Sequence, residues 1–209
     1  EACVEFVSDT FMLRFALNGI NVGRPFRSHR LSTTRHADRI YMFDSGKLVV
    51  KSGQTTFEQV ATANWDSEKA QNRMDTIIAG NYSDGTVLNA VLCSNDSTAL
   101  GVENALASSY TGEYPIITGQ DCDIANVKNL IAGKQAMSVF KDTRTLASQV
   151  VKMVDAVMQG GEAEVNDTKS YDNGTGVIPT YLCEPVVVTI DNYKEMLIDS
   201  GYYTEDQLK

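Results

Sequence analysis

The fold is decided by residues 89–121, which read NAVLCSNDSTALGVENALASSYTGEYPIITGQD. Two short apolar runs, at 90–93 and 115–118, each end in a small polar cluster that carries an acid. The segment between them has the period of an amphipathic helix, so the stretch predicts one strand, helix, strand unit. Because the carboxyl ends of neighbouring parallel strands share one edge of a sheet, the polar side chains there are expected to converge on a ligand crevice.

The same alternation continues on both sides of this unit. Further strands are expected at 47–51, 136–140, 177–182 and 186–189. Helices are expected at about 66–79, 124–132, 145–159 and 192–200. Asp66 or Ser67 begins the first of these helices and Gly80 ends it, while Asp142 and Thr143 offer an N-cap to the helix at 145–159. The order predicts an α/β fold with a doubly wound parallel sheet, in a protein with two lobes.

Composition excludes several classes of protein. The net charge of −9 over 209 residues argues against nucleic-acid binding, which requires a face of Lys and Arg. The sequence has neither a run of about 20 apolar residues, which a membrane span needs, nor a signal-peptide pattern at its start. The chain is therefore expected to be mature, truncated or cytosolic.

The four cysteines show no metal-binding spacing, and with two histidines they predict no zinc site. Cys93 and Cys122 end strands that are expected to be neighbours, so a disulfide between them is geometrically conceivable. Buried free thiols are the commoner outcome for cysteines in apolar strands.

Polar residues with complementary chemistry follow three successive strands, and a tryptophan precedes a helix. They are Asn95, Asp96, Gln120, Asp121, Lys141 and Asp142, with Trp65. Carboxylates and amides can bond vicinal hydroxyls, and a Trp face can stack on a sugar ring. Each residue alone has a structural alternative: Asp121 and Asp142 as helix N-caps, Asn95 as a turn residue, Trp65 as a core aromatic. Their joint placement favours a carbohydrate site.

Catalysis has little support in the sequence. No GxSxG, GxGxxG or Walker A motif occurs, and both His29 and His36 lie far from the polar cluster along the chain. We therefore expect no catalytic residues, no cofactor and no metal.

From residue 44 onward the motifs TANWD, SND, ITGQD, NVKNLIAGKQAMSVFKDTRTLA and EPVVVTIDNYKEMLIDSGYY resemble type I periplasmic sugar-binding proteins of ABC importers. The xylose- and multiple-sugar-binding members are the most similar. The resemblance implies a non-catalytic protein, periplasmic or extracellular, that closes over a monosaccharide and is recognised by a membrane permease. It implies stacking by Trp65, hydrogen bonds from Asn95 and Asp121, and a hinge role for Lys141.

The resemblance does not cover residues 1–43, which are too few for an N-terminal lobe and are left unassigned. Residues 44–209 are interpreted as the C-terminal lobe and hinge, with the helix at 145–159 a candidate for the other lobe. An exposed lobe face would favour self-association.

Two other functions are carried as alternatives. One is a sensory or repressor-type effector module of the same fold. The other is an ATPase fragment, because residues 29–49 resemble the switch-histidine segment of ABC exporter ATPases, with His29 in the histidine's place. An arginine-rich segment at 24–39 is interpreted as a solvated face or, alternatively, an anion site.

Overall fold

The computed structural model describes the backbone of five short segments, 4–8, 11–15, 39–43, 47–50 and 56–60, together with residues 62–84 and 86–209. The chain divides into two compact units. The first comprises Glu1–Val139 and Val187–Lys209, and the second is Phe140–Val186.

The first unit is built on a six-stranded sheet. Its strands, in spatial order, are β5 (Thr56–Val60), β3 (Arg39–Phe43), β6 (Ala90–Cys93), β7 (Ile116–Gln120), β8 (Met137–Phe140) and β9 (Val186–Val188). The pairs from β5 to β8 are all parallel, which confirms the predicted α/β fold with a parallel sheet. The sheet includes β3, which precedes residue 44.

The order of these strands creates a switch point beside β3. The next strand of this sheet along the chain, β5, lies on one side of β3, and the one after it, β6, lies on the other side. The three strands end in line, since Phe43 is opposite both Val60 and Cys93. In open parallel sheets, ligands bind outside the carboxyl ends of the strands at such a reversal.

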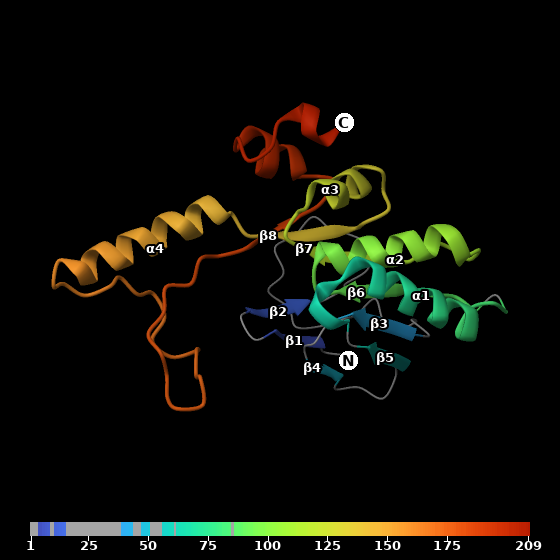
Figure 1. Ribbon diagram of the computed structural model, residues 1–209, viewed down its shortest axis with the longest axis horizontal. Helices are drawn as coiled ribbons and strands as arrows, with labels where there is room; N and C mark the ends of the chain where they lie inside the picture. The colour runs from blue at the N-terminus through green and yellow to red at the C-terminus, as the bar shows by residue number, and fades with distance from the viewer. Residues whose placement is uncertain are drawn as a thin grey trace. The chain divides into compact units, whose positions relative to one another are not determined.

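Helices connect the parallel strands of this sheet: α1 (Ser67–Asn81), α2 (Asp96–Ser109) and α3 (Ile124–Ile131). Helices α1 and α2 lie side by side (Figure 1), and Gly101 of α2 permits their close approach because a Cβ there would overlap the Ser67 carbonyl. The core beneath them is made of fully buried side chains from both helices and from β6 and β7, among them Ala70, Met74, Ile78, Val91, Val102, Leu106 and Ile117.

Smaller elements complete the first unit. A three-stranded antiparallel sheet has the order β2 (Phe11–Phe15), β1 (Val4–Ser8) and β4 (Lys47–Val50). After β9 come a π-helical turn η3 (Lys194–Asp199) and a 3-10 turn η4 (Glu205–Leu208). Leu197 and Leu208 are buried, so this C-terminal segment packs on the first unit.

The second unit contains the helix α4 (Thr143–Met158) and a turn-rich segment with two isolated bridges, Asp167 to Thr180 and Asp172 to Val177. Its interior is sparse. Between residues 141 and 186, all of which the structure describes, Gln149 is the only buried side chain.

Several predicted boundaries are corrected by the structure. Helix α1 does not end at Gly80 but continues to Asn81, although Asp66 caps its start as expected. The segment at 177–182 forms bridges rather than a strand. Strand β5 was not predicted, because the sequence TFEQV alternates too briefly to distinguish a strand from the approach to a helix.

Candidate functional site

Trp65 stands on a strained turn at the carboxyl edge of the sheet. It ends the 3-10 turn η2 (Ala63–Trp65), between β5 and the Asp66 cap of α1. Both Asn64 (φ 61°) and Trp65 (φ 50°) adopt the left-handed conformation, which is uncommon for a bulky residue. The Trp65 side chain is 50% exposed, so the interpretation as a core aromatic is wrong. An exposed aromatic face held on a strained turn is a feature of ligand sites.

Asn95 lies at the end of β6 and is the N-cap of α2. Its Oδ1 accepts hydrogen bonds from the Thr98 amide (3.1 Å) and the Thr98 hydroxyl (3.0 Å). The Asn95 amide in turn donates to Thr98 Oγ1 at 3.4 Å, which completes a capping box. The Asn95 oxygen thus has a structural role, as a helix N-cap rather than in the turn that the sequence suggested. Its Nδ2 group takes no part in the cap and, within the described part of the chain, has no hydrogen-bond partner.

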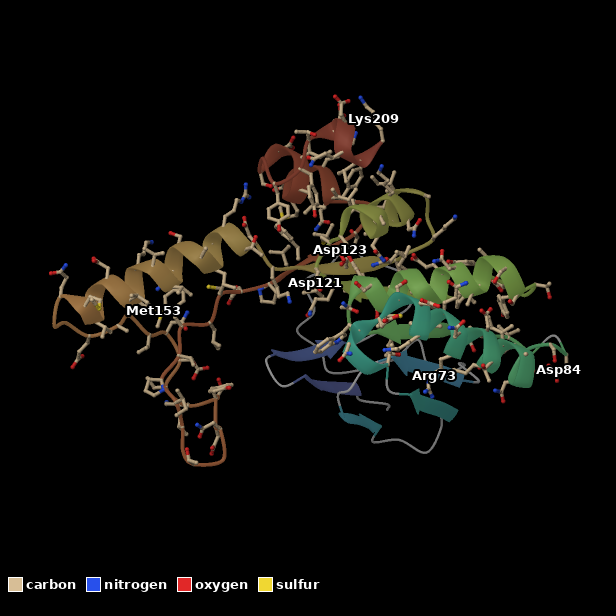
Figure 2. The ribbon with its side chains drawn as sticks, viewed as in Figure 1. Arg73, Asp84, Asp121, Asp123, Met153 and Lys209 are labelled. Carbon is tan, nitrogen blue, oxygen red and sulfur yellow. The ribbon has the colours of Figure 1, made fainter. Side chains whose placement is uncertain are left out.

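Asp121 follows β7, the strand beside β6. It begins a pair of left-handed residues, Asp121 (φ 102°) and Cys122 (φ 55°), and its amide donates to the Val139 carbonyl at 2.8 Å. Figure 2 shows Asp121 and Asp123 at the junction between β7 and α3. Asp123, not Asp121, occupies the N-cap position of α3, so the N-cap interpretation of Asp121 is wrong.

Asp96 is buried beneath these two loops rather than exposed in the crevice. Its side chain is fully inaccessible, and its carboxylate accepts hydrogen bonds from Ser138 Oγ (2.9 and 3.0 Å), Gln135 Nε2 (2.9 Å) and the Asp123 amide (2.8 Å). Burial raises the pKa of Asp96 to about 7, against the lowering effect of the bonds from Gln135, Ser138 and Asp123. The prediction that Asp96 faces the crevice is therefore wrong.

The sequence pattern did not identify the partners of Asp96. Ser138 interrupts the apolar run of β8, and Gln135 lies just before that strand; both side chains are buried. A polar residue inside a strand that is otherwise apolar was the available signal, but it does not identify a partner about 40 residues away.

Lys141 and Asp142 follow β8 and lie in the second unit, whereas Trp65, Asn95 and Asp121 lie in the first. Asp142 caps α4 by accepting from the Arg144 amide at 2.9 Å, as its structural alternative predicted. The hydrogen bonds from the Arg144 guanidinium lower the pKa of Asp142. An open polar pocket of about 420 Å³ within this unit is lined by Asp142, Arg144, Thr145, Ser148, Gln149, Lys152 and Tyr181.

The thiols of Cys93 and Cys122, at the ends of β6 and β7, are buried and protonated. Cys93 and Cys122 are free and buried, so the disulfide alternative is wrong. Burial raises the pKa of both thiols, that of Cys122 to about 12, and keeps them protonated. Among the described residues no group of His, Cys, Asp and Glu could hold a metal ion. His29 and His36 lie outside those residues, as does the arginine-rich segment, apart from the Arg39 backbone in β3.

Comparison with known proteins gives a family match. The sequence pattern of the family described as "Periplasmic binding protein domain" matches residues 27–162. The multiple sugar-binding periplasmic receptor ChvE of Rhizobium radiobacter is 48% identical over 170 residues, which are 79% of this chain and 48% of the receptor. The D-xylose-binding periplasmic protein of Escherichia coli is 31% identical over 165 residues, 79% of this chain and 47% of that protein. The chain thus spans about half the length of the curated relatives it matches.

Solved structures agree with this match. An ABC transporter solute-binding protein from Clostridium phytofermentans with bound β-D-glucose is 63% identical, with a TM-score of 0.75, over 86% of this chain and 63% of the other. A carbohydrate transporter solute-binding protein from Chloroflexus aurantiacus, in complex with D-glucose, is 25% identical, with a TM-score of 0.70, over 82% of this chain and 62% of the other. None of the helices in the described residues is long and apolar enough to cross a membrane.

Proposed function

We propose, since this chain belongs to the family of periplasmic binding protein domains, that it is a non-catalytic part of the solute-binding component of a sugar ABC importer. Its ligand is a monosaccharide, bound outside the carboxyl ends of β5, β6 and β7. The observation that carries the proposal is the arrangement of Trp65 and Asn95, which follow the two strands on either side of β3 at the switch point.

Trp65 supplies the apolar contact in this proposal. Half of its side chain is open to solvent, and its left-handed backbone persists just before a well-capped helix. The flat face of an indole matches the C–H face of a pyranose, and stacking there removes apolar surface from water.

Asn95 and Asp121 supply complementary polar contacts at the ends of adjacent strands. The cap occupies the Asn95 oxygen, which leaves the Nδ2 group to donate hydrogen bonds to sugar oxygens. The Asp121 carboxylate accepts from sugar hydroxyls, and a hydrogen bond to a charged group is stronger than one between neutral groups. A donor beside an acceptor fits two vicinal hydroxyls.

Lys141, which follows β8, is the remaining proposed contact to the sugar, and a ligand that favours a closed form of the protein would shift it toward that form. Closure of this kind is the state that a permease recognises, so a membrane permease is the proposed protein partner, and the periplasm or the extracellular space is the proposed location. Because two solute-binding proteins with glucose bound are among the structural relatives, glucose is the first ligand to test.

The second unit presents apolar surface that needs a partner. Leu146, Val150, Val154 and Val157 of α4 are each about half exposed, at the spacing of one helical face. We assign this stripe to self-association, or to contact with a lobe equivalent to the half of the relatives that this chain does not match.

Calorimetric titration with D-glucose and a panel of pentoses and hexoses tests the proposal. Binding of one sugar by the wild-type chain, abolished by Trp65→Ala and by Asp121→Ala, is the expected result. Tyr114→Ala is the matched control, since Tyr114 is 40% exposed but precedes β7, at the amino edge of the sheet. Absence of heat with every sugar, from a sample with a cooperative thermal transition, would overturn the proposal.

A further inference from the structure

A single buried carboxylate connects the two loops that carry Asn95 and Asp121. Asp96 follows Asn95 directly in the chain, as the first residue of α2. Its Oδ2 accepts a 2.8 Å hydrogen bond from the amide of Asp123, two residues after Asp121. The end of β6 and the end of β7 are therefore joined by a hydrogen bond out of contact with water, where such a bond is strong.

Ser138 extends this connection to the left-handed residues Asp121 and Cys122. Its hydroxyl donates to Asp96 and accepts from the Cys122 amide at 3.0 Å. The Tyr203 hydroxyl, from the C-terminal segment, donates to the Cys122 carbonyl at 2.9 Å. Both sides of the left-handed Cys122 are thus held by side chains, and such a conformation persists only where the surroundings fix it.

We infer that Asp96 is a positioning residue of the proposed sugar site: through Ser138 and the Asp123 amide, it fixes the turn that presents Asp121 and aligns that turn with Asn95. The inference rests on the proposed function. Asp96 itself has no exposed surface, so it acts on a ligand only through these neighbours.

The partners of Asp96 use its carboxyl group as an acceptor: Gln135, Asp123 and Ser138 each donate a hydrogen bond to it. Gln135 Nε2 donates to Asp96 Oδ1 at 2.9 Å, and its amide orientation is fixed because Gln135 Oε1 accepts from Asn126 Nδ2 at 2.8 Å. An amide in place of Asp96 would bring one donor against another, and a buried donor without an acceptor is costly.

Ser138→Ala is the first test variant, because it removes the hydroxyl that links Asp96 to Cys122. Glucose affinity is measured by calorimetry, and the exchange rates of the Cys122 and Asp123 amides are measured by NMR. We expect a loss of affinity of about tenfold and faster exchange of these two amides. The control is Leu106→Ala, which lowers stability from the buried face of α2 without a link to either loop and should change affinity by less than about twofold.

Tyr203→Phe is the second variant and decides the matter should Ser138→Ala not fold. It removes one partly buried hydroxyl and should shift the Cys122 and Asp123 amide signals, with a smaller loss of affinity. Wild-type affinity in both variants, or in Tyr203→Phe where Ser138→Ala does not fold, overturns the positioning role and leaves the proposed function intact. Failure of the wild-type chain to bind any sugar overturns the proposed function itself.

Discussion

Gly119 of β7 lies so close to Asp96 that a Cβ atom on residue 119 would overlap the Asp96 carboxylate, and would stand 2.5 Å from Gln135 Nε2. Neither group can move aside easily, because both belong to the buried network. Gly119→Ala should therefore lower the free energy of unfolding by about 3 kcal/mol in urea titrations.

Gly80→Ala provides the matched control for that change. Gly80 lies in α1, where an added Cβ would meet nothing within 4 Å. Alanine is the better helix former, so this variant should gain about 0.5–1 kcal/mol. Similar effects of the two substitutions would contradict the tight packing of Gly119 on Asp96.

Two substitutions at Asn95 separate its cap from its proposed ligand contact. Asn95→Ala loses the capping oxygen and should cost about 1 kcal/mol of stability. Asn95→Asp keeps an oxygen for Thr98 and should retain stability, but it replaces the Nδ2 donor by an acceptor and should lose sugar affinity. Thermal denaturation and glucose titration measure the two effects. Undiminished affinity in Asn95→Asp would show that Nδ2 does not contact the ligand.

The buried Glu103 of α2 should make the protein less stable as pH rises. It is 4% exposed, accepts a hydrogen bond from Asn129 Nδ2, and among the described atoms its Oε1 has no partner. Burial raises the pKa of Glu103 from 4.5 to about 7. Because the folded state favours the protonated acid, its contribution to stability is complete below pH 4.5 and is lost as pH rises through 7. The buried Asp96 acts in the same direction.

The melting temperature should therefore fall between pH 5 and pH 8. Glu103→Gln, which cannot ionise, should remove the part of this decline that Glu103 causes. That part is on the order of 3 kcal/mol of unfolding free energy between pH values below 4.5 and pH values above 7, and the part that Asp96 causes should remain. A Glu103→Gln protein with the wild-type slope would contradict the assignment.

The apolar stripe of α4 predicts self-association. Val154 lies within the stripe and Val151 lies outside it on the same helix, and both are more than half exposed. Val154→Asp should weaken concentration-dependent association in sedimentation experiments, whereas Val151→Asp should leave it unchanged. A wild-type chain that sediments as a clean monomer at high concentration would refute the prediction.

Local patterns predicted most of the sheet and its helices. The boundaries of β6 followed from its apolar run, and the presence of α2 from the helical period between β6 and β7. The caps at Asp66 and Asp142 followed from residue type and position. The placement of β3 between β5 and β6 could not be predicted, because strand order depends on contacts between segments distant in sequence.

The residues at the surface of the candidate site could be identified from the sequence, but the buried network beneath them could not. Asn95 and Asp121 lie at strand ends, as expected, and Trp65 is exposed. Asp96 shares their sequence context, yet it is buried, because Ser138 and Gln135 supply donors from another strand. Sequence position alone does not separate an acid that faces solvent from one that is enclosed by distant partners. The sugar-binding roles of Trp65, Asn95, Asp121 and Lys141 stay predictions.

The nearly empty interior of the second unit affects how the chain responds to denaturant. The slope of unfolding free energy against denaturant concentration scales with the surface newly exposed on unfolding. Residues 141–186 bury only one side chain and have little further surface to expose. In urea, the chain as a monomer should therefore show the slope of a protein considerably shorter than 209 residues.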